Sequence, residues 1–300
     1  MTTLTTPVTP RRSVTLHDTI SDELIEQVRR DGFGVLRGAL TEDEVAEINA
    51  EAVRVCRGEL GEIGGDHTPA APDEPDDVVL RRYLCIHMAH KISDVLSRAL
   101  AHPRIVEVLT KVIGPNVKAM QSMLFIKSEG KPGQAWHQDE YFIPTRDRSL
   151  TAAWIALDDA TVENGCLWVL PGSHQRGVIY PQRPHDNREF DCTGESYGFP
   201  YSDDDAVPVE VPAGAVVFFN GYLLHRSLKN SGKHGYRRAL VNHYMSAESL
   251  LPWRPEDGHV AAWDYRDIVM VAGEDPYAYK GTADIARPHV RPDGEGGCDR

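Results

Sequence analysis

The first third of the chain spaces its apolar residues three or four positions apart, which is the pattern of amphipathic helices. Residues 21–30 form the first such segment, and Ser21 is a suitable N-cap for it. Residues 41–57 form the second, where Thr41 and Glu44 make a capping box at its start. The apolar stripes of these segments are Leu24, Ile25 and Val28, and Val45, Ile48, Ala52 and Val55. Two further helices are expected over residues 91–100 and 103–113.

From residue 117 onward the pattern changes to short β-rich runs, separated by turns that contain proline and glycine. The expected strands are residues 117–127, 151–157, 166–170, 207–211, 215–219 and 237–245, with an earlier strand at 33–36. Helices first and strands afterwards indicate an α+β, mainly β domain whose second part is a β-sandwich or a β-barrel.

The domain organisation follows from the same pattern. Residues 1–16 are polar and rich in threonine and proline, so we expect a flexible arm there. A single domain is expected over residues 17–300, with N-terminal helices to about residue 115. Its β core would span about 117–247, and a capping segment would follow over about 250–300.

Residues 58–77 combine many acidic residues with proline and glycine and cannot supply an apolar core. They predict a mobile surface loop. A solvated acidic loop is the plainer interpretation, and a lid over an active site is the sharper one.

Charge and composition narrow the class of function. The 300 residues carry 32 lysines and arginines against 45 aspartates and glutamates, a formal net charge of −13. Such an excess of acid argues against nucleic acid as a partner. No apolar run approaches the ~20 residues of a membrane span, so no membrane partner is expected. No secretory signal is expected at the N-terminus either. Five scattered cysteines argue against a disulfide framework and fit a reducing compartment, so a cytoplasmic location is expected.

A candidate metal site begins at His137 and Asp139, which lie two positions apart just after the 117–127 strand. On an extended backbone such residues point to the same face, so an imidazole and a carboxylate could bind one ion. His225 follows the strongly apolar strand 215–219 and could supply a second imidazole. Two imidazoles and one carboxylate form the facial triad of non-haem Fe(II) oxygenases.

Basic residues downstream of this triad strengthen the hypothesis. Arg237 and Arg238 open the strand that follows His225, so one guanidinium could lie beside the metal and bind a dicarboxylate. Strand alternation allows only one of the two arginines to face inward. Ser227 shares the face of His225 and could donate its hydroxyl to the same carboxylate.

A rival metal site would use His87, His90 and Asp94, provided that this segment is one helix. Two other classes of function also stay open. One is a metal-dependent hydrolase or isomerase on a cupin-like barrel, indifferent to O₂. The other is a non-catalytic sensor that binds a dicarboxylate.

Several motifs occur together and in order between about Ser21 and Ala247. They are Arg30-Asp31-Gly32-Phe33-Gly34-Val35-Leu36, Trp136-His137-Gln138-Asp139, Asn164-Gly165-Cys166-Leu167, Leu170-Pro171-Gly172-Ser173-His174, and His225-Arg226-Ser227 leading to Arg237-Arg238-Ala239-Leu240. With these motifs the chain resembles the phytanoyl-CoA dioxygenase family of Fe(II)- and 2-oxoglutarate-dependent oxygenases.

The resemblance implies a double-stranded β-helix, a cupin-like jelly roll wrapped by N-terminal helices. It implies that Fe(II), 2-oxoglutarate and O₂ are the cofactors. The family's iron ligands match His137, Asp139 and His225, its co-substrate arginine and hydroxyl match Arg237 and Ser227, and further co-substrate contacts match Lys127 and Trp154. The activity implied is hydroxylation, or another oxidation, of an unactivated C–H bond of a small molecule, with a role in biosynthetic tailoring.

The substrate itself is not encoded in any motif. Specificity is expected in residues 58–77, in the insert 175–205 and in the C-terminal segment, where loops could close over the barrel mouth. A cationic substrate follows if Asp203, Asp204 and Asp205 face the pocket. The net charge disfavours a fatty acyl-CoA, and both a monomer and a homodimer are compatible with the sequence.

Overall fold

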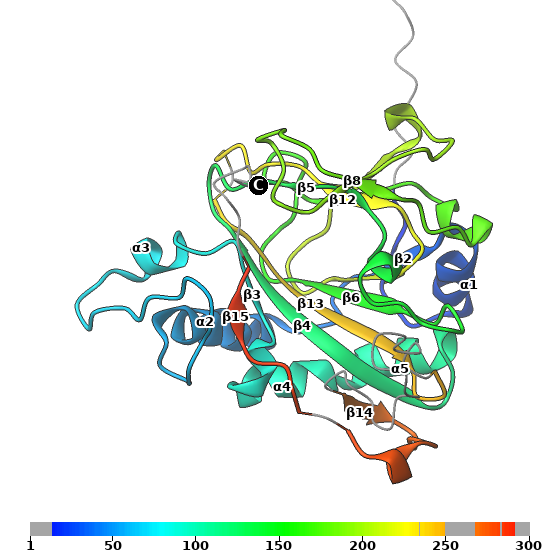
Figure 1. Cartoon of the computed structure of the whole chain (residues 1–300), viewed down its shortest axis with the longest axis horizontal. Coiled ribbons are helices and arrows are strands. Elements are labelled where there is room, and N and C mark those ends of the chain that lie inside the picture. The colour runs from blue at the N-terminus through cyan, green and yellow to red at the C-terminus, as the bar shows by residue number, and fades with distance from the viewer. Residues whose placement is uncertain (1–13, 234, 250–267, 283, 292–300) are drawn as a thin grey trace, which may run out of the picture.

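The computed structural model describes residues 14–233, 235–249, 268–282 and 284–291 (Figure 1). Most of the expected N-terminal arm, residues 1–13, lies outside these ranges. So do residues 250–267 and 292–300 of the expected C-terminal capping segment.

The two N-terminal helices begin where the sequence places their N-caps. Helix α1 (Asp22–Asp31) starts at Ser21, whose hydroxyl accepts a hydrogen bond from the Leu24 N–H. Helix α2 (Glu42–Arg57) starts with the expected capping box: the Thr41 hydroxyl accepts from the Glu44 N–H, and the Glu44 carboxylate accepts from the Thr41 N–H. The other α-helices are α3 (Asp76–Leu80), α4 (Asp94–Leu100) and α5 (Pro103–Val112). No helix within the described ranges has the length and apolar character needed to cross a membrane.

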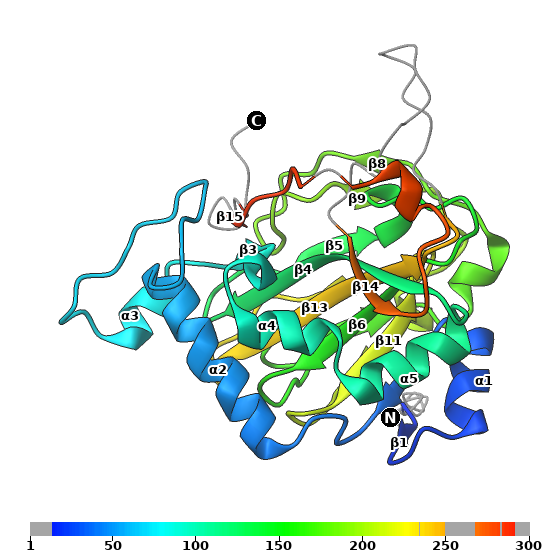
Figure 2. The same cartoon turned by 90° about the horizontal axis from the view of Figure 1, so that it is seen from below.

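The larger sheet has nine strands and is mixed, since β1 and β2 run parallel and the other pairs antiparallel. Its order is β1 (Leu16–His17), β2 (Phe33–Leu36), β11 (Val216–Asn220), β6 (Thr151–Ala156), β13 (Arg237–Ser246), β4 (Val117–Lys127), β3 (Cys85–His87) and β15 (His289–Val290), while β14 (Val269–Ala272) pairs with β4. Helices α2, α4 and α5 cover one face of this sheet (Figure 2). Their apolar side chains and those of the covered face form one continuous core.

The smaller sheet lies across from the uncovered face of the larger one (Figure 1). Its order is β10 (Val207–Val209), β7 (Leu167–Val169), β12 (His225–Ser227) and β5 (Gln134–His137), all antiparallel. A two-stranded hairpin, β8 (Gln182–Arg183) and β9 (Glu195–Ser196), belongs to the insert. A second apolar core lies between the two sheets. Some of its residues, among them Trp154 and Phe219, also line a cavity between the sheets.

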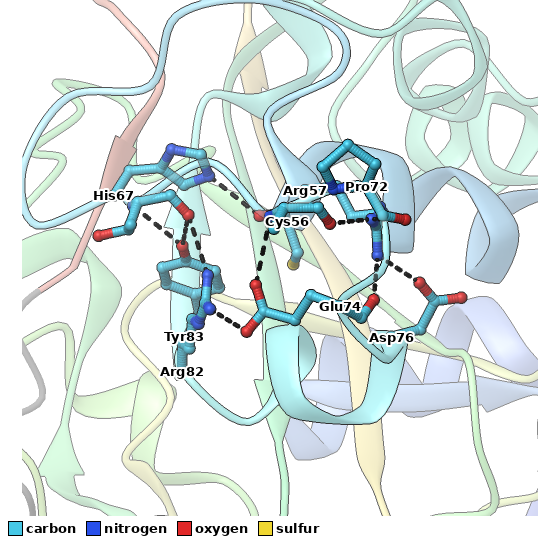
Figure 3. Close-up of polar contacts among 10 residues, drawn as sticks. Cys56, Arg57, His67, Pro72, Glu74, Asp76, Arg82 and Tyr83 are labelled. Carbon is cyan, nitrogen blue, oxygen red and sulfur yellow. Dashed lines mark hydrogen bonds and ion pairs between the residues drawn. The ribbon is translucent and has the colours of Figure 1, made fainter.

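The acidic segment 58–77 is folded against the C-terminal end of α2 by hydrogen bonds and ion pairs (Figure 3). Arg57, whose side chain is 12% exposed, donates to the Glu74 carbonyl and the Asp76 carboxylate, both at 2.8 Å. Arg82 forms an ion pair with the Glu74 carboxylate, and the His67 ring contacts the Cys56 carbonyl. The acidic charges therefore serve to fold this loop. None of its residues lines the cavity, so the lid interpretation gains no support.

The cysteines differ from the sequence expectation at one position. Cys56, Cys85 and Cys166 are free and buried, and burial raises the pKa of the Cys166 thiol to about 12, so it is protonated at neutral pH. Cys192, however, is disulfide-bonded. One disulfide is not a framework, but it removes the cysteine pattern as an argument for a reducing compartment.

The capping box of α2 gives a stability test. We expect Thr41→Ala to lower the free energy of unfolding by about 1 kcal/mol, because the Glu44 N–H loses its acceptor. Urea denaturation measures this. Thr41→Ser keeps the hydroxyl and is the control, which should stay close to wild type. Equal stabilities for Thr41→Ala and Thr41→Ser would contradict the role given to the hydroxyl.

Candidate metal centre

A cavity of about 270 Å³ lies between the two sheets. Strands of both sheets, the insert and the C-terminal segment all contribute to its wall. Its polar and ionisable lining residues are His87, Gln121, Gln134, His137, Asp139, Thr193, His225, Arg226, Ser227, Arg237, His243 and Arg291. The cavity therefore gathers four histidines and three arginines around a single lining carboxylate.

The three residues of the predicted triad meet on one wall of this cavity. His137 and His225 are directly opposite each other on the adjacent strands β5 and β12, with ring centroids 4.0 Å apart. Asp139 follows β5 at the start of a short 3₁₀ turn. Its Oδ1 atom lies 3.7 Å from His137 Nε2 and 3.5 Å from His225 Nε2. All three side chains are buried, and their ligand atoms lie within 4.8 Å of one another.

Backbone carbonyls fix the orientation of both imidazoles. His137 Nδ1 donates to the carbonyl of Ala135 at 2.8 Å, and His225 Nδ1 donates to that of Leu223 at 2.9 Å. Since a carbonyl can only accept, the proton of each neutral ring lies on Nδ1, and the Nε2 lone pair is free. Burial and the neighbouring His225 lower the pKa of His137 to about 3, so this ring is neutral at pH 7. Neutral imidazoles with free Nε2 atoms and an ionised carboxylate are the donor set that a divalent iron ion requires.

Asp139 is held in its ionised form by the rings around it. Burial alone would raise its pKa, but His225, His243 and His137 outweigh burial and hold the pKa below its usual range. Its Oδ2 atom accepts a hydrogen bond from His243 Nε2 at 3.1 Å, while Oδ1 faces His137 and His225. His243 thus occupies one carboxylate oxygen and leaves the other for an ion.

His243 is a residue of the site that the sequence motifs did not identify. The available signal was alternation along β13, because Arg237, Val241 and His243 are separated by even numbers of residues and all line the cavity. The contact with Asp139 could not be read from that pattern, since it joins residues 104 positions apart.

The structure distinguishes the two neighbouring arginines. Arg237 lines the cavity and is 2% exposed, and its Nε donates to the Gly165 carbonyl at 3.0 Å. Its guanidinium lies over the rings of Trp154 and Phe125. Arg238 faces away from the cavity and pairs with Asp158 at 2.6 Å.

The surroundings of Arg237 leave its charge without a carboxylate partner among the described residues. No carboxylate in the described part of the chain lies within ion-pair distance of it, and burial lowers its pKa to about 10. A buried guanidinium in this condition is suited to bind an anion that enters the cavity.

Of the remaining predicted co-substrate residues, Ser227 and Trp154 line the cavity and Lys127 does not. Lys127 is buried behind Ser227, where its Nζ donates to the Ser227 hydroxyl at 3.0 Å and to the Leu228 carbonyl at 2.7 Å. Burial and the nearby Arg237 hold the pKa of Lys127 well below its usual value. Lys127 therefore contacts Ser227 of the cavity wall and does not itself line the cavity.

The prediction of a rival metal site is wrong, because His87, His90 and Asp94 do not share a helix. His87 ends β3, His90 lies in a 3₁₀ turn, and Asp94 begins α4. The His90 ring is hydrogen-bonded to the Ser122 hydroxyl at 2.7 Å. Among the residues that the structure describes, only His137, Asp139 and His225 form a group of three potential metal ligands.

Comparisons with known sequences point to one family. The sequence model of the family described as phytanoyl-CoA dioxygenase (PhyH) matches residues 28–239. The chain is 31% identical over 235 residues to the peroxisomal phytanoyl-CoA dioxygenase of Rattus norvegicus, which covers 73% of this chain and 66% of the relative. It is 39% identical over 127 residues to a phytanoyl-CoA dioxygenase of Arabidopsis thaliana, covering 41% and 44%. The matches thus span less than two thirds of the length of these relatives.

A solved structure gives a further comparison. The non-heme alpha ketoglutarate dependent carbocyclase SnoK from nogalamycin biosynthesis is 25% identical, with a TM-score of 0.58, and the match covers 83% of this chain and 92% of that one.

The contact between His243 and Asp139 generates a prediction. We expect His243→Leu to weaken Co(II) binding by about 10- to 100-fold, because Asp139 loses the donor that orients it. Isothermal titration of the metal-free protein measures this. His243→Gln, which can place an N–H near the same oxygen, should recover part of the affinity.

His102→Gln is the matched control, since His102 contacts Glu44 on the helical side and does not line the cavity. Wild-type affinity in His243→Leu, with the fold intact by circular dichroism, would show that His243 does not position Asp139.

Proposed function

The chain belongs to the phytanoyl-CoA dioxygenase family, and from this premise we propose that it is an Fe(II)- and 2-oxoglutarate-dependent dioxygenase. It oxidises an unactivated C–H bond of a small molecule, by hydroxylation or a related oxidation. The observation that carries the proposal is the placement of a two-histidine, one-carboxylate group and an uncompensated buried arginine in one cavity. The first can hold a redox-active metal, and the second can hold a dicarboxylate.

In the proposed enzyme, His137, Asp139 and His225 hold the iron. The three side chains would supply two imidazole nitrogens and one carboxylate oxygen, a donor set typical of non-haem Fe(II) sites that also bind a co-substrate. The bound iron, together with 2-oxoglutarate and O₂, supplies the oxidising chemistry. The chain contributes binding, orientation and exclusion of water, because the triad lies in a cavity walled by two sheets.

Arg237 and Ser227 bind the far carboxylate of 2-oxoglutarate in this proposal. The unused N–H groups of Arg237 can form a two-pronged contact with a carboxylate. Lys127 donates to the Ser227 hydroxyl oxygen, so the hydroxyl proton is free to point toward the cavity. Trp154 lines the cavity beside Arg237, whose guanidinium carbon lies 5.5 Å from the centroid of the Trp154 ring.

The two facing sheets support the finer assignment of a double-stranded β-helix core. We also infer a role in small-molecule tailoring. Support comes from SnoK, whose description names a carbocyclase of nogalamycin biosynthesis.

The proposal is tested by anaerobic visible absorption of the full chain with Fe(II) and then 2-oxoglutarate. We expect a metal-to-ligand charge-transfer band in wild type and its loss in His137→Ala, which removes a metal ligand. Admission of O₂ to the same sample should then lead to the formation of succinate. A hydrolase would give no band, and a dicarboxylate sensor would bind 2-oxoglutarate without forming succinate.

The two adjacent arginines provide a matched pair of variants. Arg237→Ala should weaken 2-oxoglutarate binding by about 100-fold, because a charged two-pronged contact is lost. Arg238→Ala should change it less than about twofold, since Arg238 pairs with Asp158 outside the cavity. Titration of the charge-transfer band measures both. Equal effects of the two substitutions would contradict the assignment of Arg237.

A further inference from the structure

Besides Arg226 and Arg237, Arg291 reaches the cavity. It comes from the C-terminal part of the chain, outside the segment that matches the family. Arg291 directly follows β15, which pairs with β3 in antiparallel register at the edge of the larger sheet (Figures 1 and 2). Its N–H donates to the Cys85 carbonyl at 2.9 Å. The rings of His87 and His289 stack across the two strands with centroids 4.8 Å apart. The backbone of Arg291 is therefore fixed relative to the cavity wall.

The side chain of Arg291 is held from behind by the insert 175–205. Its Nη2 atom forms an ion pair with Asp191 at 2.6 Å and donates to the Thr193 hydroxyl. The Asp191 side chain is 1% exposed, and the Asp191 N–H donates to the Gly133 carbonyl at 2.8 Å, beside β5. The insert and the C-terminal segment thus meet to place one guanidinium beside the metal centre.

Only one of the three guanidinium nitrogens of Arg291 is used in this contact. Its Nε and Nη1 atoms make no hydrogen bond to any residue in the described ranges, and the side chain lines the cavity. Their N–H groups are available to an acceptor that enters the cavity.

Among the described residues, the other basic side chains that line the cavity differ from Arg291 in their surroundings. Arg226 pairs with Asp203 at 3.0 Å and lies 4.5 Å from the centroid of the Trp136 ring. Arg237 is assigned to 2-oxoglutarate above. Burial, together with the charge of Arg291, lowers the pKa of His87 to about 3, so that ring is neutral.

We propose that Arg291 binds a carboxylate of the primary substrate, so that the substrate class is small carboxylic acids. The inference rests on the proposed function, because it assigns the second anion of a site whose first anion is 2-oxoglutarate. Among the described residues, Asp139 is the only carboxylate that lines the cavity, and it faces the two histidines of the triad. The described lining therefore offers no further acidic residue to receive a cationic substrate.

The expectation of a cationic substrate depended on Asp203, Asp204 and Asp205 facing the pocket. All three are exposed and none lines the cavity. Asp203 instead accepts hydrogen bonds from Arg226 and from the Trp136 indole. The condition for a cationic substrate is therefore not met.

The size and wall of the cavity describe the rest of the substrate. At about 270 Å³ the cavity lies near the lower end of ligand pockets, ~300–1,000 Å³, and it must also accept 2-oxoglutarate. The apolar residues Phe142 and Ile143, which follow Asp139 in the sequence, also line the cavity, and Phe142 is 50% exposed. A short apolar body carrying one carboxylate fits these features.

The test uses pairs of probes that differ only in charge: hexanoate against hexanamide, and phenylacetate against phenylacetamide. Each is titrated anaerobically into the full chain loaded with Fe(II) and 2-oxoglutarate, and the shift of the charge-transfer band reports binding. We expect each carboxylate to bind wild type at least about 10-fold more tightly than its amide.

Arg291→Gln alone would leave the Asp191 carboxylate buried without its partner, so the double variant R291Q/D191N is measured. It removes both charges, and we expect it to form the band and to bind acid and amide equally. Arg183→Gln is the control, because this exposed arginine of the same insert pairs with Glu195 and does not line the cavity. It should keep the preference for acids.

The outcomes separate the two proposals. No charge-transfer band in wild type defeats the proposed function, and this inference with it. A band in wild type without a preference for carboxylates overturns the inference alone. So does a preference that persists in R291Q/D191N, and so does a double variant that no longer forms the band, because Arg291 would then serve the metal centre.

Discussion

The pairing of β5 with β12 is the constraint on which the site depends. It places His137 opposite His225, and it brings both Nε2 atoms to one oxygen of Asp139. Because side chains alternate along a strand, a slip of one residue in this pair would turn one histidine away from the other. Gly133 lies next to the start of β5, and a Cβ atom there would come within 2.0 Å of the Ser227 carbonyl. Glycine at this position therefore permits the close approach that sets the register.

The same region contains buried basic side chains that have no carboxylate partner among the described residues. Arg237 and Lys127 are both buried, and neither forms an ion pair with a carboxylate of the described residues. Their N–H groups donate instead to neutral acceptors: Arg237 to the Gly165 carbonyl, and Lys127 to the Ser227 hydroxyl and the Leu228 carbonyl. Neutral acceptors offset only part of the cost of burying a cation, so burial lowers the pKa of both groups.

Much of this structure can be predicted from the sequence, because residues close together in the chain determine it. The caps of α1 and α2 and the long strands β4 and β13 are specified by neighbouring residues, and His137 and Asp139 lie two positions apart. Strands β3, β12 and β15 have two or three residues each, too few to show a period, and partners distant in the sequence define them. The burial of Lys127 behind Ser227 and the contact of His243 with Asp139 depend on such distant pairings as well.

Strand β3 links the central sheet to the C-terminal strand. It pairs with β4 of the central sheet on one side and with β15 on the other, so the position of β15 depends on that of the central sheet. The triad is held by β5, β12 and the residues that follow β5, whereas Arg291 is held by β15 and the insert. The candidate metal ligands and Arg291 therefore depend on different contacts. In the proposed enzyme, the part of the fold that would hold the iron is thus separate from the part that would select what is oxidised.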